Sequence, residues 1–573
     1  MLLSIVDQLL EGFLARGFPD EVINLYHNFK AIGKSTDIKA LKSAFSQMIR
    51  LSKRTFIILD ALDEFPKDTR ESLLSWIGEL TVDHDAGSLS ILVTSRPEAD
   101  IARSLEPLAT SAISLQSKTV DPDIRTYIQN SLDGKNGFRR FTKEIKSEIE
   151  DTLISRSEGM FRWMVCLLRI IEDCMTPQDV RESLKELPED LDSVYLRILG
   201  TIPKKQKEYI RRAMRWLTFS AVPLTLGQLA EAIVIEYDVN KYGQEPGTLF
   251  DVNFLIGICP SLISFEDARD DESSSQESRR LRLAHFSVKE YLISDRAAQG
   301  PSAFYYVSEG RANLLMGHAC LSRILRHSTQ GIVCGSKVET ISFLYHSARY
   351  WFVYIRSIEV MAPTPLSSAV LKVHELGQGW IDIYDPDSPY RLGPDSRAYP
   401  PAIHYSSLLN LVMACKLLAN RKEDAVNVNA QGGEYGNALQ AAATQGNESV
   451  MRFLLGCGAE VNAQGGRYGS ALQAAAFQGN EPVVKLLLEC GADVNAQGGS
   501  YDNALQAAAS QGNESVVRLL LERGADVNAQ GGEFGNALQA AEALRHGSIV
   551  QLLITHGAVP YAGILADTCS MTN

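Results

Sequence analysis

The most regular hydrophobic pattern in the chain is a repeat near the C-terminus. The segments NALQAAATQGNESV, SALQAAAFQGNEPV, NALQAAASQGNESV and NALQAAEALRHGSI begin 33 residues apart, at Asn437, Ser470, Asn503 and Asn536. A Leu-rich run, a glycine and a polar segment such as DVNAQGG follow. This order predicts a short helix, a second helix and an extended finger in each unit. One unit cannot bury its own apolar face, so the units are expected to stack.

Short apolar runs in the N-terminal part have the pattern of buried strands. Residues 55–59 (TFIIL) and residues 89–94 (LSILVT) are each followed by polar residues, and residues 111–116 (SAISLQ) form a third, weaker run. Continuous apolar runs of this length are typical of parallel strands that are covered on both faces. The three runs therefore predict part of a parallel α/β sheet.

The polar residues after the first two runs suggest a ligand-binding edge. Asp60, Asp63 and Glu64 follow the first run, and Arg96 follows the second. In a parallel sheet the carboxyl ends of the strands share one edge, where ligands bind. There Asp60 can hold Mg²⁺ through water, and Asp63 or Glu64 can orient an attacking water. Arg96 can contact a terminal phosphate.

The tripeptide Gly-Lys-Ser in KAIGKSTD (residues 30–37) raises the question of a phosphate-binding loop. Such a loop needs Gly-x4-Gly-Lys-Ser/Thr after a buried strand. The first glycine is replaced by Asn28, and the preceding INLYHNFK is too polar for a central strand. Because an apolar-periodic segment follows, Ser35 or Thr36 is interpreted as a helix N-cap. A working NTPase that uses Lys34 is the alternative.

The middle of the chain is predicted to be helical. Residues 123–199 have helical periodicity, with Trp163 on an apolar face, and Thr225 is expected to cap a helix that a short apolar strand follows. The segment RLRLAHFSVKEYLI (residues 280–293) predicts a strand and then a helix. Residues 266–280 form a polar run that is interpreted as a loop.

Composition narrows the class of protein. The 573 residues are 45% hydrophobic and 22% charged, with a net charge of −13, which is typical of a globular chain and disfavours broad binding to nucleic acid or anionic membrane. The nine cysteines are scattered and contain no repeated CxxC, so neither a disulfide framework nor a zinc site is indicated. No apolar run is long enough for a membrane span. We therefore expect a cytoplasmic protein, with an amphipathic helix rather than a signal peptide at residues 2–14.

The C-terminal units resemble the ankyrin repeat in their period, their helix pair and the ending GADVNA. The resemblance covers residues 431–562, and a degenerate unit precedes it at 401–420. Asn437 to Gln440 stand where the family has Thr-Pro-Leu-His, so the hydrogen bonds of that corner must be replaced by amides or lost. In this family the fingers and the ends of the first helices line a groove for a partner protein.

Two sets of positions vary between otherwise similar copies, and the resemblance implies that they contact a partner. The alternative is neutral drift of exposed positions. Aromatic residues at the next finger position (Tyr435, Tyr468, Tyr501, Phe534) are interpreted as packing between fingers. The predicted contact residues are Glu434, Arg467, Ser500 and Glu533 in the fingers, and Thr444, Phe477 and Ser510 after the first helices.

The segments FIILDALDE and LVTSRPE resemble the Walker B motif and first sensor of a NACHT domain, the nucleotide-binding module of NOD-like receptors, as found in fungal NACHT–ankyrin proteins. The resemblance implies ATP or ADP with Mg²⁺ as cofactors, bound through Asp60 and Arg96. It also places His285 on the β-phosphate of ADP, although a core or turn histidine is an equal alternative. The P-loop of this family precedes the helix that begins here at Leu2, so the chain is expected to start downstream of it.

The predicted fold class is a multidomain α/β plus α protein that combines a partial P-loop NTPase sheet, helical and winged-helix domains and an ankyrin solenoid. Without the P-loop strand, the strand near Ile113 is expected to fill its place, or the module to pack poorly. The leading function is a NACHT–ankyrin signalling protein with a protein partner, impaired nucleotide binding and self-assembly; a nucleotide-independent adaptor is the alternative. The expected domains are 1–118 (NACHT remnant), 119–203 (helical), 204–298 (winged helix), 299–398 (bridge) and 399–563 (ankyrin repeats).

Overall fold

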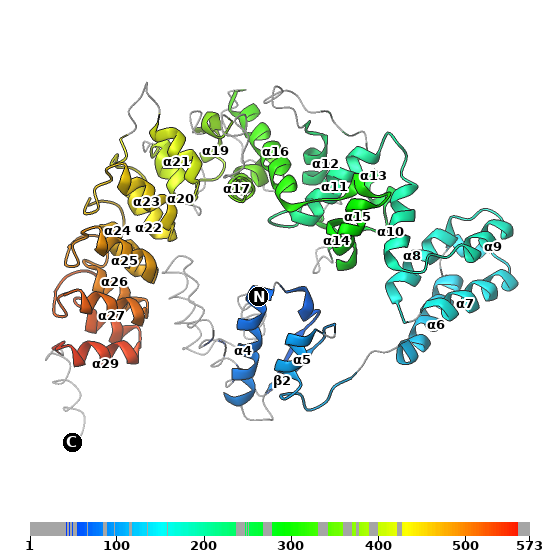
Figure 1. The fold of residues 1–573 in the computed structure, drawn as a ribbon, viewed down its shortest axis with the longest axis horizontal. Coiled ribbons are helices and arrows are strands. Elements are labelled where there is room, and N and C mark those ends of the chain that lie inside the picture. The colour runs from blue at the N-terminus through cyan, green and yellow to red at the C-terminus, as the bar shows by residue number, and fades with distance from the viewer. Residues whose placement is uncertain are drawn as a thin grey trace, which may run out of the picture. The chain divides into compact units, whose positions relative to one another are not determined.

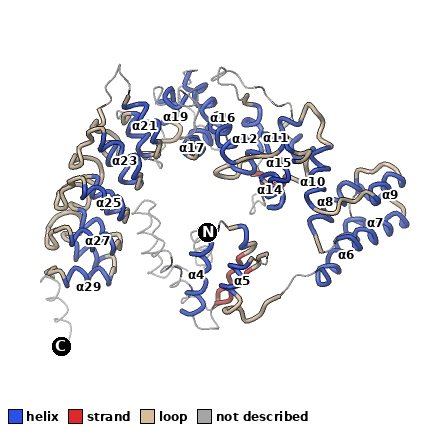
Figure 2. Tube along the Cα trace, in the orientation of Figure 1, coloured by secondary structure: helices blue, strands red, loops and turns tan. Residues whose placement is uncertain are grey.

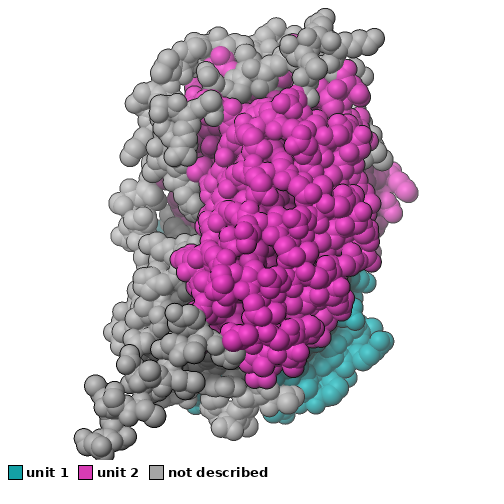
Figure 3. Space-filling view, turned by 90° about the vertical axis from the view of Figure 1, so that its left-hand side faces the viewer, with its two compact units in different colours: residues 1–164, 175–180 teal, residues 165–174, 181–573 magenta. Residues whose placement is uncertain are grey.

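A computed structural model, whose helices and strands are labelled in Figure 1, divides the chain into two compact units (Figure 3). The first comprises residues 1–164 and 175–180, and the second comprises residues 165–174 and 181–573. We describe each unit by itself. The described residues are 42, 45, 49 and 54–559, except 66, 84–88, 97, 114–116, 135, 158, 237–246, 248, 250, 267–277, 330–341, 359–368, 374–377, 389–398 and 421–426. The predicted helix at residues 2–14, the tripeptide at 33–35 and most of the polar run at 266–280 lie outside them.

The first unit contains a two-stranded parallel sheet. Strand β1 (Thr55–Leu59) has the bounds expected from the sequence, and β2 (Leu89–Val93) ends one residue earlier than expected. The strands pair with Ile57 opposite Ile91. After β1 the chain forms η1 (Leu62–Glu64) and α4 (Lys67–Asp83), and after β2 it forms α5 (Ala99–Leu105).

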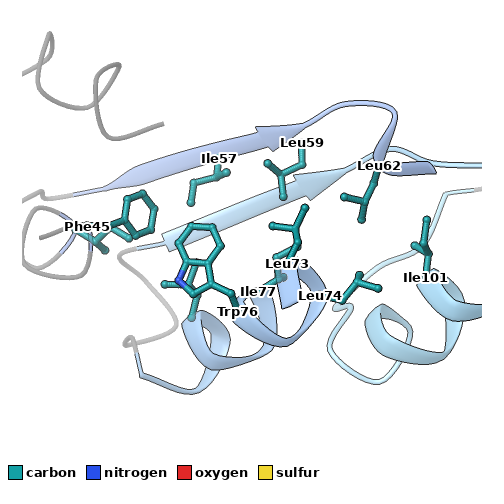
Figure 4. Packing of buried hydrophobic residues seen from close by; sticks show 11 residues of the cluster. Phe45, Ile57, Leu59, Leu62, Leu73, Leu74, Trp76, Ile77 and Ile101 are labelled. Carbon is teal, nitrogen blue, oxygen red and sulfur yellow. The ribbon is translucent and has the colours of Figure 1, made fainter. Parts of the chain in front are cut away.

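One hydrophobic cluster of this unit lies on one face of the sheet (Figure 4). Residues alternate along β1, so that Ile57 and Leu59 are buried against α4. Helix α4 contributes Leu73, Leu74, Trp76, Ile77 and Leu80, and α5 contributes Ile101. The ring of Trp76 also packs on Phe45, with 5.1 Å between ring centroids. Burial of these apolar side chains is the main stabilising contribution in this part of the chain.

The opposite face of the sheet is exposed. Phe56, Ile58 and Leu92 have 65%, 69% and 57% of their surface accessible, and Ile58 and Leu92 are register partners. The expected third strand does not form in its described part, because residues 111–113 are irregular and Ile113 is 81% exposed. Ile113 stands between Ala112 and Ser114, and the chain enters a helix at Ser117, so this run has too few large apolar positions to hold a place in the sheet.

A series of helices follows the sheet. Trp163 is 1% exposed, which confirms its predicted place in the core. Tyr195 is fully buried and packs 5.7 Å from the ring of Tyr291, which lies in a later helix of the same compact unit. The helices are α6 (Ser117–Gly134), η2 (Asn136–Arg140), α7 (Lys143–Ser157), α8 (Phe161–Glu172), α9 (Pro177–Lys185) and α10 (Leu191–Gly200).

The next segment combines helices with a two-stranded antiparallel sheet. Thr225 caps α12 with a complete capping box, as the sequence predicts, in which its side chain and that of Gln228 bond to each other's backbone N–H. The short strand expected after α12 is not formed at residues 235–236. The predicted strand and helix near residue 285 are present as β4 and α14. The elements are α11 (Lys207–Phe219), α12 (Leu226–Val234), α13 (Phe254–Ile258), β3 (Ile263–Phe265), β4 (Leu281–Leu283), α14 (Phe286–Ile293), α15 (Asp295–Gln299) and η5 (Ala303–Tyr305).

Bridging helices connect this segment to the repeats. Helices α16 (Glu309–Thr329) and α17 (Phe343–Arg356) pack on each other and on α11 and α12. Trp380 in α19 (Gln378–Ile381) packs 5.6 Å from Trp351 in α17 and 5.7 Å from Tyr405 in the first repeat helix. These buried aromatic rings make the connection continuous within the second unit.

The C-terminal part is a stack of helix pairs separated by loops (Figure 2). Each first helix packs on the first helix of the next pair. The pairs are α20 (Ala402–Leu408) with α21 (Val412–Ala419), α22 (Ala438–Gln445) with α23 (Glu448–Gly456), α24 (Ala471–Phe477) with α25 (Glu481–Glu489), α26 (Ala504–Ser510) with α27 (Glu514–Glu522), and α28 (Ala537–Ala543) with α29 (Gly547–Thr555).

Amide side chains replace the hydrogen bonds of the usual ankyrin corner. Asn437 and Gln440 cap α22 reciprocally, and Gln440 Nε2 donates to the carbonyls of Ala463, Gly465 and Gly469 in the next finger at 3.0–3.3 Å. A second amide series works at the loop ends: Asn429 donates to the Gly458 carbonyl, and Asn462, Asn495 and Asn528 repeat this contact one unit later each time. The predicted replacement by amides is therefore confirmed.

Candidate functional site

The carboxyl edge of the β1–β2 sheet brings Asp63 and Arg96 together. The Arg96 backbone N–H donates to Asp63 Oδ1 at 3.0 Å, and Arg96 Nε lies 3.3 Å from Asp63 Oδ2. The Asp63 side chain is 10% exposed, whereas that of Arg96 is 50% exposed. Both oxygens of Asp63 therefore hold the turn after β2, which competes with a role in orienting water.

Asp60 is bound to the same turn through Thr94. The Thr94 hydroxyl donates to Asp60 Oδ1 and accepts the Ala61 N–H at 2.8 Å, while the Leu62 N–H donates to the Thr94 carbonyl at 2.9 Å. These bonds hold Ala61 in the left-handed region (φ 51°, ψ 54°), which is rare for a residue with a Cβ. The Asp60 side chain remains exposed at the edge of the sheet.

The remaining predicted residues of this site are less closely defined. Glu64 ends the short helix η1, and its side chain lies outside the described part of the structure. The described residues contain no group of three or more His, Cys, Asp or Glu side chains that could hold a metal ion. Asp60 fits a water-mediated contact to Mg²⁺, because one exposed carboxylate is sufficient for that contact.

His285 lies in the second unit and caps α14. Its Nδ1 accepts the Ser287 N–H at 3.1 Å and lies 2.6 Å from the Ser287 hydroxyl, which in turn lies 2.7 Å from the Tyr195 hydroxyl. The ring is exposed to solvent. A turn histidine, one of the two interpretations left open by the sequence, is therefore present, and the contact to a phosphate stays a prediction.

The finger residues form a second candidate site. The backbone N–H of Arg467 donates to the Glu434 carbonyl at 2.8 Å, that of Ser500 to the Arg467 carbonyl at 3.0 Å, and that of Glu533 to the Ser500 carbonyl at 3.4 Å. We call these four residues the finger row. Arg467, Ser500 and Glu533 are exposed and Glu434 is half-buried, and the Arg467 guanidinium lies 3.3 Å from the Glu434 carboxylate.

Three predicted contact residues cannot meet a partner, which corrects the sequence interpretation. Thr444, Phe477 and Ser510 are only 4%, 1% and 1% exposed. The hydroxyls of Thr444 and Ser510 donate to carbonyls of their own helices, at 2.9 and 2.8 Å. These side chains vary between copies inside the stack, because they fill the space between one unit and the next.

Aromatic side chains beneath the finger row explain this burial. The rings of Tyr435 and Tyr468 are stacked, with an interplanar angle of 3° and 6.3 Å between centroids. Phe477 lies between Tyr468 and Tyr501, 5.0 Å from each ring. Burial raises the pKa of the Tyr468 hydroxyl to about 12. The packing role predicted for these finger tyrosines is confirmed.

Asp387 is a functional candidate that the sequence analysis missed. It lies in the boundary segment DIYDPDSPY before the first repeat. One carboxylate oxygen accepts the Glu434 N–H, and the other lies 2.7 Å from His404 Nε2. The only sequence signal is the group Asp382, Asp385 and Asp387, and these residues cannot be told from ordinary polar residues of a Pro-rich loop.

Comparisons with protein families match both ends of the chain. Residues 471–562 and 439–488 match models of ankyrin repeats. Residues 1–96 match the family described as Nephrocystin 3, N-terminal, a family associated with NACHT proteins. The matched segment includes the sheet edge with Asp60 and Arg96.

Two fungal proteins are similar to the chain. The Azaphilone pigments biosynthesis cluster protein L of Monascus ruber is 36% identical over 300 residues, which cover 48% of this chain and 61% of that protein. The Vegetative incompatibility protein HET-E-1 of Podospora anserina is 24% identical over 258 residues, which cover 44% of this chain and 18% of that protein. In these matches the chain resembles fungal NACHT–ankyrin repeat proteins. It matches less than two thirds of the length of either relative.

The ankyrin matches give the finger row a general meaning. Ankyrin repeats generally mediate contacts between proteins. Among the described residues, no helix is both long and apolar enough to span a lipid bilayer.

Proposed function

We propose that this NACHT–ankyrin chain is a signalling protein whose finger row binds a partner protein. The observation that carries the proposal is the contrast between the amides that repeat inside the stack and the exposed finger tips, which vary. The interior amides repeat from unit to unit, whereas Glu434, Arg467, Ser500 and Glu533 differ in charge and sit on one backbone ladder. Such a row presents a fixed sequence of charges, and complementary charge gives specificity in protein recognition.

We further propose that nucleotide binding is impaired in this chain. Support comes from the sheet edge, where Asp63 is paired with Arg96 and Asp60 is bonded to Thr94. Asp60 would be the residue that contacts Mg²⁺ through water, and the Mg²⁺ would neutralise phosphate charge when bound. Phosphate affinity in such proteins depends mainly on backbone N–H groups of a glycine loop. Asn28 in place of the loop's first glycine argues against that contribution from residues 30–37.

A charge-swap experiment tests the partner proposal. The variant Glu434→Arg with Arg467→Glu reverses the finger pair, and the matched control Glu448→Arg with Arg452→Glu reverses an exposed pair in α23 whose atoms lie 2.6 Å apart. Proteins captured from fungal extract by the unchanged chain should be lost by the finger variant and kept by the control. If both variants retain the same proteins, the finger row is not the binding surface.

A thermal-shift experiment tests the nucleotide proposal and separates a switch from an adaptor. We expect ATP or ADP with Mg²⁺ to change the melting temperature of the chain by less than about 1 °C, because a ligand below its Kd adds little stability. A shift of several degrees that Asp60→Ala removes would show a working nucleotide switch instead. Light scattering of the same samples, with and without nucleotide, checks the predicted self-assembly.

A further inference from the structure

The first finger of the repeat stack meets a different neighbour from all later fingers. Each later member of the finger row donates its N–H to the carbonyl of the preceding finger. In the described part of the chain no ankyrin finger precedes Glu434, and its N–H donates to the Asp387 carboxylate. A side-chain oxygen from the boundary segment therefore occupies the place of a backbone carbonyl.

A separate observation, from the finger glycines, supports this substitution. Gly433, Gly466 and Gly499 stand at equivalent positions with positive φ. A Cβ on Gly466 would lie 2.2 Å from the backbone of Tyr435, and one on Gly499 would lie 2.2 Å from the backbone of Tyr468. A Cβ on Gly433 would instead lie 2.4 Å from Asp387 Oδ2 and 2.8 Å from the Pro400 ring. Asp387 and Pro400 thus fill the volume that a preceding finger fills elsewhere.

Asp387 is held firmly enough for this role. It is 4% exposed, and its second oxygen lies 2.7 Å from Nε2 of His404, which is fully buried in α20. The Asp387 N–H donates to Asp385 Oδ1 at 2.9 Å, and the Tyr405 hydroxyl donates to the same oxygen at 3.3 Å. Both oxygens of a buried carboxylate are therefore engaged, and such groups are costly to move.

We propose that Asp387 is a positioning residue for the partner surface. It stands in for the carbonyl of a preceding repeat and so fixes Glu434, the first member of the finger row, in register with Arg467. The α19 helix just before it packs on the bridging helix α16, so the bridge sets where the row begins. The term partner surface rests on the function proposed above, whereas the positioning itself does not.

Hydrogen exchange of the finger amides in the full chain tests this role. In Asp387→Ala, the Glu434 amide should exchange at least about tenfold faster, the Arg467 amide less so, and the Ser500 and Glu533 amides within about twofold of the unchanged chain. Asp387→Asn should give an intermediate increase, because its single carbonyl oxygen has to serve two donors. The control Asp493→Ala removes a carboxylate that accepts only the Asn495 N–H of its own finger, and it should leave Glu434 unchanged.

Two outcomes would overturn the proposal. One is a Glu434 amide that exchanges at the same rate in Asp387→Ala. The other is an equal acceleration of all four finger amides in both Asp387 variants, which would indicate a general loss of stability rather than positioning. The measurement needs no partner, so a failed charge-swap experiment would reject the proposed function and leave this result standing.

Discussion

The ring of Phe477 lies 5.0 Å from the ring of Tyr468, although Phe477 varies between repeats as a contact residue would. The equivalent positions in the two adjacent units hold Thr444 and Ser510. We expect Phe477→Ser to lower the free energy of unfolding of the repeats by roughly 3 kcal/mol, because both flanking rings lose their packing. Urea denaturation followed by circular dichroism measures this change.

Ser510→Ala is the matched control for that prediction. The Ser510 hydroxyl donates to the Ala507 carbonyl of its own helix and accepts the neighbouring Gln511 side-chain N–H at 3.3 Å, both local bonds, so its loss should change the free energy of unfolding by no more than about 0.5 kcal/mol. Equal effects of the two variants would mean that Phe477 does not carry the packing between fingers.

The amide links between units predict a position-dependent effect of glutamine substitution. Gln473 Nε2 donates to the carbonyls of Ala496, Gly498 and Asp502 in the next finger, at 2.6–3.3 Å. We expect Gln473→Ala to cost roughly 2–3 kcal/mol of unfolding free energy, because the largely buried carbonyls lose their donor. Gln539 occupies the same position in the last described unit, where its backbone N–H donates to the Asn536 side chain but its Nε2 has no hydrogen-bond acceptor among the described residues. Gln539→Ala should therefore cost about 1 kcal/mol or less in the same denaturation experiment.

The pair at the sheet edge predicts a structural role for Asp63. Because Asp63 accepts a backbone N–H as well as meeting the Arg96 side chain, Asp63→Ala should destabilise the first unit by roughly 1–2 kcal/mol. Arg96→Ala removes only a half-exposed side chain and should cost less than about 1 kcal/mol. Hydrogen exchange of the β1 and β2 backbone amides in the full chain compares the two. A larger effect for Arg96→Ala would contradict this order.

Burial of His346 predicts a loss of stability at acidic pH. Desolvation lowers the pKa of His346 from 6.5 to about 3. This residue of α17 is 2% exposed, and its ring packs on Trp216. Between these values the unfolded chain binds a proton that the folded chain does not, so the stability contribution present above pH 6.5 falls as pH decreases. We expect about 2 kcal/mol to be lost between pH 7 and pH 5.

His346→Phe provides the comparison, since it keeps an aromatic ring and removes the titrating group. The Tyr354 hydroxyl, 3.0 Å from His346 Nε2, still accepts the Ala221 N–H in that variant. The melting temperature of the unchanged chain should fall relative to that of His346→Phe as the buffer becomes more acidic. A constant difference from pH 7 to pH 5 would show that His346 does not control the acid sensitivity.

Local patterns in the sequence were sufficient to predict elements that depend on local physics. The strand at 55–59, the Thr225 cap and the repeat stack follow from apolar periodicity, a capping box and a fixed period. The third strand at 111–116 was wrong for its described residues, because a weak apolar run needs a sheet neighbour that no local pattern guarantees.

The candidate sites depended on packing that the sequence does not display. Variation at Phe477 looked the same as variation at Arg467, although one residue fills the interior and the other is exposed. Asp387 was missed because its role arises from the first finger, 47 residues later in the chain. The predicted sheet edge was compatible with a pairing of Asp63 and Arg96. Only the geometry shows that both carboxylate oxygens of Asp63 contact Arg96.

The asparagine series beginning at Asn429 has a consequence for how such a gene can change. Every contact in the series joins a residue to one at a constant offset in the following copy. Removing or duplicating one whole copy would leave each amide facing an equivalent carbonyl. Gain or loss of whole copies can thus lengthen or shorten the array without creating a misfit, and new tip residues can be sampled on an unchanged frame.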